Sequence, residues 1–446
     1  MKIRFPHPLT LLTGCIFLGA ALSYVLPAGQ YERRDDPATG RQVVVAGTYH
    51  EIARQPVGPF QSVVAIPRGL ADAGSIVFLV FLIGGAFTVV DKTGALRRGV
   101  GWLVARLGHR ELLVIPVVSL AFASAGALEN MQEEIIALIP VLLVLTRGLG
   151  FPALTAVSMS AGAAFVGAAF SPINPFQVGI AQKLAELPLL SGAPFRLIFL
   201  ALALAVWIGA TMRHARRRRT APEISSDGNG EPMNRRDGLI LGLVLATFGV
   251  LVYGLLGLGW DFDQMSALFF VMGVVVGLVG RLGVTGTAEA YAEGFRSMAY
   301  AALLIGFARA IFVVLQDGRV VDTIIHGMFT PIADLSLGLS ALGMMVAHTA
   351  VHVPVPSVSG QAVLTMPVLV PLSDLLGLSR QVTVLAYQFG AGLCDLITPT
   401  NGALLAILAA GGVGYQEWLS FAFRWYVALF ALGAVALVTA VLTGLA

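Results

Sequence analysis

Ser171-Pro-Ile-Asn174 and Thr398-Pro-Thr-Asn401 each set a hydroxyl residue, a proline and an asparagine at the end of an apolar segment. The two stretches belong to an internal repeat, because residues 139–182 align without a gap on residues 366–409 and 11 of the 44 positions are identical. Proline breaks a helix, while Ser, Thr and Asn supply oxygen ligands. Broken helices at matching places in two repeats indicate the binding site of a transporter.

The composition of the chain agrees with a membrane protein. Of its 446 residues, 57% are hydrophobic and 12% are charged, whereas about a quarter of the residues of a soluble domain are charged. Many apolar runs approach the roughly 20 residues that a helix needs to cross a bilayer. The net charge of +3 comes from basic residues in short loops, which is typical of membrane orientation. We therefore expect the lipid bilayer and a small-molecule substrate as partners, and no nucleic acid.

The N-terminal apolar run Leu9–Leu26 follows the basic residues Lys2 and Arg4, as the hydrophobic part of a signal peptide would. The run is longer than that part usually is, and no convincing small-x-small cleavage site follows it. We expect it to be retained, so that residues 1–59 comprise a first transmembrane helix and an external loop.

The repeat and one abrupt change of composition divide the rest of the chain. Between residues 213 and 237, arginines flank a polar stretch rich in Ser, Gly, Asn and Pro, which predicts a disordered linker on the cytoplasmic side. We expect the first repeat at residues 60–212, connecting transmembrane helices at 238–284 and the second repeat at 285–446. The arginine bias indicates that the two copies have opposite orientations. This places the N-terminus in the cytoplasm and the C-terminus outside.

Two apolar segments, Ile135–Leu145 and Ala362–Leu372, are too short to span a bilayer alone. Because they occupy corresponding places in the repeat, we interpret each as one arm of a re-entrant hairpin, which must be buried in protein or line a wet cavity. The predicted fold is an all-α polytopic membrane protein. It is an inverted-topology repeat transporter with two re-entrant helical hairpins and two broken helices.

The candidate substrate- and ion-binding residues lie at the hairpin tips and at the breaks. They are Glu129, Asn130, Glu133, Glu134, Ser171, Asn174, Ser357, Ser359, Asp395, Thr398, Thr400 and Asn401, with Pro172 and Pro399 as the helix-breaking residues. Carbonyls freed beside the prolines suit a cation, and half-helix N-termini suit a carboxylate. The glutamates of the first tip create a negative field, since charge within a membrane tends to be functional. The alternatives are that the two asparagines only cap helices and that the first tip lies in water.

Isolated polar groups inside apolar runs add one predicted pair. Arg309 and Asp395 are each surrounded by apolar residues, so a mutual charge pair would reduce the cost of burying them. It would serve as a structural latch or as a coupling site. His348 and His352 are four residues apart, but no third ligand is adjacent, so we expect no metal site. We also expect no cofactor beyond a coupling ion, sodium or a proton.

Three motifs resemble the YfcC-type basic amino-acid antiporters, which are grouped with the anaerobic four-carbon dicarboxylate carriers in the ion transporter superfamily. They are Glu129-Asn-Met-Gln-Glu-Glu134, Ser171-Pro-Ile-Asn-Pro-Phe176 and Thr398-Pro-Thr-Asn-Gly402. Leu26-Pro-Ala-Gly-Gln-Tyr31 fits the same family, and the resemblance covers essentially the whole chain. It implies two helical hairpins, usually a homodimer, and a transport domain that slides against a scaffold.

The hairpin tips depart from the related sodium-coupled carboxylate transporters, whose tips carry Ser-Asn-Thr. Here the first tip has Glu129-Asn130 and the second has Pro356-Ser357-Val-Ser359. Sodium coupling and carboxylate specificity therefore do not follow from the resemblance.

These observations predict a secondary transporter of the inner or plasma membrane that moves a small polar organic solute by alternating access. Basic amino acids, exchanged for another solute, are the leading substrate class, because tip glutamates suit a cationic arm and half-helix ends suit a carboxylate. The alternative is a four-carbon dicarboxylate or other carboxylate, coupled to sodium or protons. A remote alternative is a membrane-embedded enzyme that uses Glu133 and His352 as acid–base groups.

Overall fold

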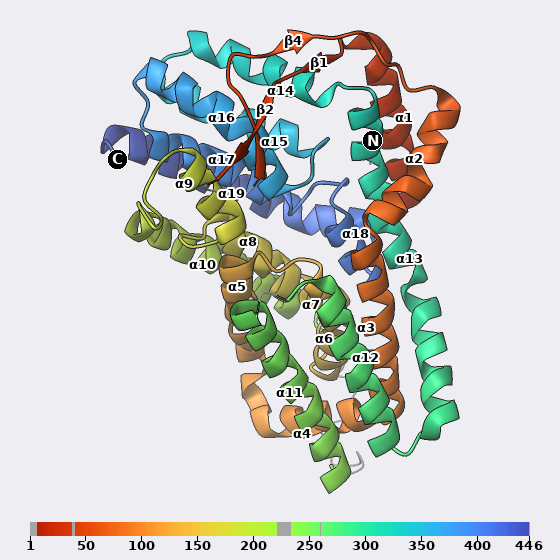
Figure 1. The fold of residues 1–446 in the computed structure, drawn as a ribbon. Helices are drawn as coiled ribbons and strands as arrows, with labels where there is room; N and C mark the ends of the chain where they lie inside the picture. Colours follow the sequence, from red (N-terminus) through yellow and green to blue (C-terminus); the bar gives the residue numbers. More distant parts are fainter. Residues whose placement is uncertain (1–6, 38–40, 221–232, 259, 446) are drawn as a thin grey trace.

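The computed structural model describes residues 7–37, 41–220, 233–258 and 260–445, and most of them are helical (Figure 1). Within these residues, eight helices are long and apolar enough to cross a membrane: Pro8–Val25, Gly74–Lys92, Arg110–Leu128, Ala193–Arg217, Phe262–Val279, Gly283–Asp317, Val358–Leu376 and Tyr415–Leu442. The prediction of an all-α polytopic membrane protein is confirmed.

Two long helical segments lie side by side and form the spine of the molecule (Figure 1). One consists of α2 (Pro59–Asp72) and α3 (Gly74–Lys92), and the other is α13 (Gly283–Asp317). Helix α1 (Pro8–Val25) packs on α13, whereas α12 (Phe262–Val279) packs on α3. The two long segments occupy equivalent places in the two repeats. Each one packs against the helix that precedes the other in the chain: α1 precedes α2 and packs on α13, and α12 precedes α13 and packs on α3.

Glycines allow the long helices to approach closely. A Cβ added at Gly69 would lie 2.6 Å from backbone atoms of Gly306 and Ala310, and one at Gly294 would lie 2.5 Å from the carbonyl oxygen of Gly84. Small residues at helix interfaces are the usual means by which membrane helices pack. This contact therefore depends on the absence of side chains at these positions.

The structure also contains two helix–turn–helix hairpins. The first hairpin is α5 (Val114–Glu129) with α6 (Glu134–Gly148), and the second is α15 (Leu337–His352) with α16 (Val358–Leu376). The predicted short arms lie within α6 and α16, but α16 has 19 residues and continues through two internal prolines. The interpretation of residues 362–372 as a segment too short to span was therefore wrong about helix length, although its place in a hairpin is confirmed.

Each repeat also contains a helix that stops at a non-helical break, as the fold prediction requires. In the first repeat, the helical run 153–169, which contains a π-helical turn, ends before residues 170–174. A second π-helical turn, Pro175–Gly179, and then α9 (Ile180–Leu184) follow. In the second, α17 (Arg380–Cys394) ends before residues 395–401, and α18 (Gly402–Ala410) follows. Helices α10 (Ala193–Arg217) and α19 (Tyr415–Leu442) complete the two repeats and pack on each other.

The predicted loop after α1 is a small β element. Strands β1 (Gly29–Gln30) and β4 (His50–Glu51) pair antiparallel, as do β2 (Arg33–Asp36) and β3 (Arg41–Val44). Strand β1 contacts α14 (Val321–Phe329), while β3 contacts α16 of the second hairpin. The β element therefore packs on α14 and on the second hairpin.

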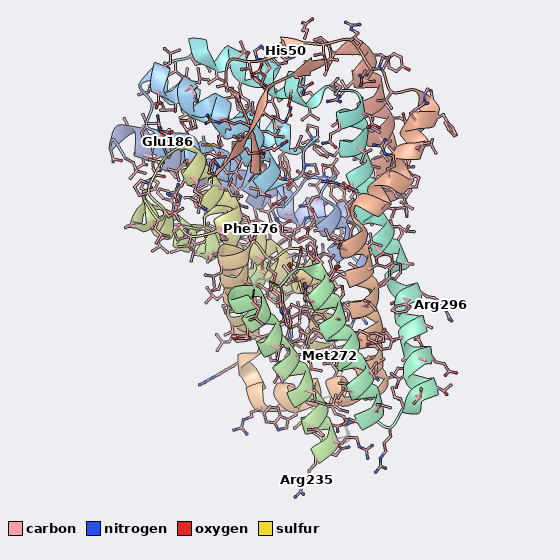
Figure 2. All side chains as sticks on the ribbon, in the orientation of Figure 1. His50, Phe176, Glu186, Arg235, Met272 and Arg296 are labelled. Carbon is pink, nitrogen blue, oxygen red and sulfur yellow. The ribbon has the colours of Figure 1, made fainter. Side chains whose placement is uncertain are left out.

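Arginine-rich segments meet at one end of the molecule, where Figure 2 labels Arg235, and His50 lies at the opposite end. There Arg98 of α4 (Ala95–Leu107) contacts Asp237 of α11 (Arg235–Leu258) at 2.7 Å. Thr220 N donates to the Gly150 carbonyl at 2.9 Å. Residues 221–232 of the predicted linker lie outside the described residues. The boundaries of the five predicted parts and their membrane orientation stay predictions.

Candidate functional site

A cavity of about 530 Å³ lies where the two hairpin tips, the second break and α13 meet. Its apolar wall includes Ile305 and Phe312 of α13. Its polar lining consists of Asp72, Gln132, Glu133, Arg309, Ser357, Ser359, Thr400 and Asn401. The structure thus brings residues from both predicted tips and from one predicted break to a single hollow.

Asn401 both caps a helix and lines this cavity. Its Oδ1 accepts a hydrogen bond from the backbone N–H of Leu404 at 3.0 Å, which caps α18, and its Nδ2 donates to Asp395 Oδ1 at 2.7 Å. Thr400 Oγ1 donates to the carbonyl of Val353 at 2.6 Å and so ties the break to the second tip. The sequence predicted either a helix cap or a site residue at Asn401, and the two roles are therefore compatible.

Asp395 is the centre of a buried polar cluster next to the cavity. Besides Asn401, its carboxylate is contacted by Gln132 Nε2 at 2.9 Å and by His352 Nε2 at 2.9 Å. These partners come from the first tip and from the last residue of α15. Gln132 was missed from the sequence because it carries no charge, and His352 was not among the predicted binding residues. The signal for His352 was a lone polar residue between apolar neighbours.

The predicted pair between Arg309 and Asp395 is wrong. Arg309 forms its ion pair with Asp72, and both side chains are about half exposed at the cavity. Arg309 lies on α13 and faces the end of α2, whereas Asp395 lies in the break and is already bonded to three side chains. Each of the two charged groups is therefore paired or hydrogen-bonded to other side chains.

The asparagine of the first break also caps a helix, but the side chains of this break do not line the cavity. Asn174 Oδ1 accepts from the backbone N–H groups of Phe176 and Gln177, both at 2.9 Å, and its Nδ2 donates to the Gly126 carbonyl at 2.9 Å. Ser171 Oγ donates to the carbonyl of Ala127 at 2.7 Å. Both side chains are fully buried, and neither lines the cavity. Asn174 and Asn401 therefore do not face one shared hollow.

The first tip contributes one acidic residue to the cavity lining. Glu133 lines the cavity, and Glu134 Oε2 accepts from the backbone N–H of Gln132 at 3.1 Å. Asn130 turns the chain with a positive φ of 54° and accepts from Gln177 Nε2 at 3.2 Å. The side chain of Glu129 is outside the described part of the structure.

Other predicted site residues have local roles. Ser357 Oγ accepts from the Gly360 backbone N–H at 3.2 Å and caps α16. Thr398 Oγ1 lies 2.8 Å from Cys394 Sγ. Pro172 and Pro399 lie within the two breaks, as expected. In the part of the chain that the structure describes, no group of three or more His, Cys, Asp or Glu is placed to hold a metal ion.

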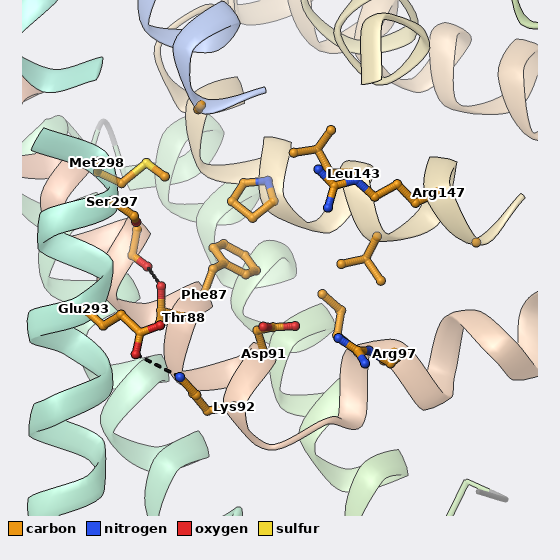
Figure 3. Close-up of a pocket in the computed structure, with 16 residues that line it drawn as sticks. Phe87, Thr88, Asp91, Lys92, Arg97, Leu143, Arg147, Glu293, Ser297 and Met298 are labelled. Atoms are coloured by element: carbon orange, nitrogen blue, oxygen red, sulfur yellow. Dashed lines mark hydrogen bonds and ion pairs between the residues drawn. The ribbon is translucent and has the colours of Figure 1, made fainter. Parts of the chain in front are cut away.

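A second cavity, of about 470 Å³, is lined by α3, α6 and α13 (Figure 3). Lys92 and Glu293 form an ion pair of 2.8 Å at its edge, and Asp91, Arg97 and Arg147 also line it. Helices α3, α6 and α18 each border the first cavity near their beginning and the second cavity near their end. The two hollows therefore lie at opposite ends of the same three helices.

Two curated proteins are similar to the chain over most of its length. One is "Putative basic amino acid antiporter YfcC" of Escherichia coli K12, which is 33% identical over 86% of this chain and 81% of that protein. The other, an uncharacterized protein of Haemophilus influenzae, is 27% identical over 98% of this chain and 97% of that protein.

Among solved structures, the chain is similar to the YdaH transporter of Alcanivorax borkumensis, with 17% identity and a TM-score of 0.46 over 98% of this chain and 99% of that one. It is also similar to MtrF of Neisseria gonorrhoeae, with 17% identity and a TM-score of 0.42 over 98% and 95% of the two chains.

The family model described as "C4-dicarboxylate anaerobic carrier", DcuC, matches residues 5–442. With the membrane helices, paired hairpins and paired breaks described above, this match makes the protein a multi-pass secondary transporter and not an enzyme. The chain belongs to the DcuC family of carriers.

Proposed function

We propose that the protein moves a basic amino acid across the bacterial inner membrane, in exchange for another solute, by alternating access. The observation that carries this proposal is the charge of the cavity between the hairpin tips. Asp72 and Glu133 are its two carboxylates and Arg309 is its one guanidinium among the described lining residues. Because Arg309 is paired with Asp72, Glu133 in its ionised form would leave the lining with one net negative charge. Lysine, arginine and ornithine each carry one net positive charge at neutral pH.

The same cavity offers groups for the α-carboxylate of such a substrate. Helix α18 begins at its wall, since Asn401, Gly402 and Ala403 all line it. The N-terminal N–H groups and the dipole of a helix favour a carboxylate. Ser357 and Ser359 add two hydroxyl groups to the lining. The cavity thus suits a zwitterion with an additional cationic arm.

The two cavities support alternating access. In an elevator-like motion, the hairpins and broken helices would slide past the long helices α2, α3 and α13, and the substrate would pass from one cavity to the other along α18. The proposal places the N-terminus and the arginine-rich linker in the cytoplasm and the C-terminus outside, in a homodimer.

Counterflow into vesicles tests the substrate. Purified protein in liposomes preloaded with lysine should take up labelled lysine, arginine or ornithine faster than labelled succinate. Glu133→Gln should remove this preference, because it deletes the unpaired charge of the lining. Glu51→Gln is the matched control, since Glu51 is exposed in the β element, away from the cavity. Equal lysine counterflow by wild type and Glu133→Gln would contradict the assignment.

Four-carbon dicarboxylates, coupled to sodium or protons, are the second candidate, favoured by the description of the family model and by Arg309 in the cavity. A dicarboxylate would meet Glu133 with like charge unless a cation or a proton neutralised it. Counterflow of succinate or malate, with no response to basic amino acids, would decide for this candidate.

A further inference from the structure

A chain of four buried side chains runs through the second hairpin to the second break. Asp395 contacts His352, the Nδ1 of His352 faces Gln361 Oε1 at 3.2 Å, and Gln361 Nε2 lies 2.9 Å from His348 Nδ1. The four side chains are at most 3% exposed. Hydrogen bonds satisfy the buried polar atoms of these side chains, except His348 Nε2, which has no partner among the described residues.

One backbone contact fixes the orientation of the chain. Gln361 Nε2 also lies 2.9 Å from the carbonyl oxygen of His348, which can only accept a hydrogen bond. The amide nitrogen of Gln361 must therefore point to His348, and its oxygen must point to His352. Because an amide oxygen cannot donate, His352 has to carry a proton on Nδ1.

That proton determines the state of the contact between His352 and Asp395. If Nδ1 holds the only proton of a neutral imidazole, Nε2 presents a lone pair to Asp395 Oδ1 at 2.9 Å. A hydrogen bond then forms only if another proton lies between them, on the imidazolium or on the carboxylic acid. We infer that His352 and Asp395 form a proton-binding site of this transporter, and that the site holds its proton in this conformation.

The groups around Asp395 suit a proton better than a metal cation. Asn401 presents Nδ2, because its Oδ1 is bound to the backbone of Leu404, and Gln132 presents Nε2. Sodium requires oxygen ligands, whereas these neighbours offer N–H groups to the carboxylate. The other titratable groups that act on the pair are Glu133 at the first tip, Cys394 on α17 and His348 on α15.

The site is connected to the cavity through two amides. Gln132 and Asn401 both donate to Asp395, and both line the cavity. A cationic arm drawn to Glu133, which lines the cavity beside these amides, opposes a bound proton by like charge. Since coupling between two ligands is reciprocal, each should weaken the binding of the other. This coupling rests on the proposed substrate class, and it implies that the solute exchanged for the basic amino acid is a proton.

Nitrogen NMR of the full protein in lipid, labelled with ¹⁵N-histidine, tests the site without any substrate. The resonances that disappear in His352→Gln are those of His352 among the seven histidines. At neutral pH we expect a protonated Nδ1 and an Nε2 that shares a proton with Asp395 in wild type, and an Nε2 without a proton in Asp395→Asn. An Nε2–H tautomer with a bare Nδ1 in wild type, or an Nε2 signal unaltered by Asp395→Asn, would overturn the inference.

Proton release in weakly buffered detergent solution tests the coupling. Lysine binding should release protons, up to about one for each lysine bound, from wild type and from Asp374→Asn, an exposed control, but none from Asp395→Asn. Lysine binding that releases the same number of protons from Asp395→Asn would refute the coupling. Absence of lysine binding in wild type would refute the proposed substrate and leave the NMR result to decide the proton site.

Discussion

The two repeat-equivalent asparagines provide a matched pair of mutations. Asn401→Ala removes the cap of α18, which typically contributes about 1 kcal/mol, and the hydrogen bond to the buried carboxylate of Asp395. A hydrogen bond to a charged group contributes about 1.5–3 kcal/mol, so the total loss of stability is about 2.5–4 kcal/mol. Asn174→Ala also removes a cap, but its other bond is to the neutral carbonyl of Gly126. We expect it to lose about 2 kcal/mol.

Substrate binding should separate the two variants more sharply than stability does. Asn401 lines the cavity and Asn174 does not. If the substrate takes one hydrogen bond of about 1.5–3 kcal/mol from the Asn401 region, its loss weakens Kd by roughly ten- to a hundredfold. We expect Asn174→Ala to keep the wild-type Kd in the folded protein.

The assay is a thermal-unfolding titration in detergent, which gives stability without ligand and affinity from the ligand-induced rise in Tm. Counterflow in liposomes then compares transport at saturating substrate. Equal effects of the two mutations on Kd, or wild-type affinity in Asn401→Ala, would show that Asn401 is only a cap and that the cavity is not the binding site.

A half-exposed ion pair, a close helix–helix contact and the membrane orientation can each be tested separately. Asp72→Asn should alter the free energy of unfolding by less than about 1 kcal/mol, because its pair with Arg309 is half exposed. In binding competition it should shift the preference from lysine toward succinate, because Arg309 loses its partner, and an unchanged preference would show that Arg309 is not part of the binding site. Gly69→Ala should destabilise the protein by about 1–3 kcal/mol, because the added carbon meets the backbone of α13; Gly209→Ala, which meets no atom within 4 Å, is the control in the same unfolding assay. Single cysteines in the linker and near the C-terminus should react with impermeant reagents from opposite sides of the membrane, and labelling from one side would refute the inverted orientation.

The fold class could be predicted from the sequence because aligning the two copies of the repeat shows which positions are equivalent. Aligning 139–182 on 366–409 located both breaks, and the prolines and asparagines in them have the same backbone roles in the structure. Hairpins were predictable because two short apolar segments occupied equivalent places. The length of α16 was not, because its internal prolines and polar ends lower its hydropathy without ending the helix.

The partners of the buried groups could not be predicted from one sequence. Arg309 and Asp395 are both isolated charges in apolar runs, and complementary charge says nothing about distance. Asp72 was not among the predicted site residues, yet it is the partner of Arg309. Gln132 gave no signal of its own, because a neutral amide between charged residues is usually a surface group. The β element was also missed, since strands of two to four residues are too short for a recognisable alternation.

The position of α18 between the two cavities has a consequence for the electrical work of transport. This helix has nine residues, and at a rise of 1.5 Å per residue it is about 14 Å long, roughly half of the hydrocarbon thickness of a bilayer. If water fills both cavities, most of the membrane potential falls across this thin layer. A lysine that crosses it alone gains or loses about 2.3 kcal/mol for every 100 mV. Exchange of one lysine for one proton would carry no net charge, and the driving force would then come from the pH difference and the lysine gradient alone.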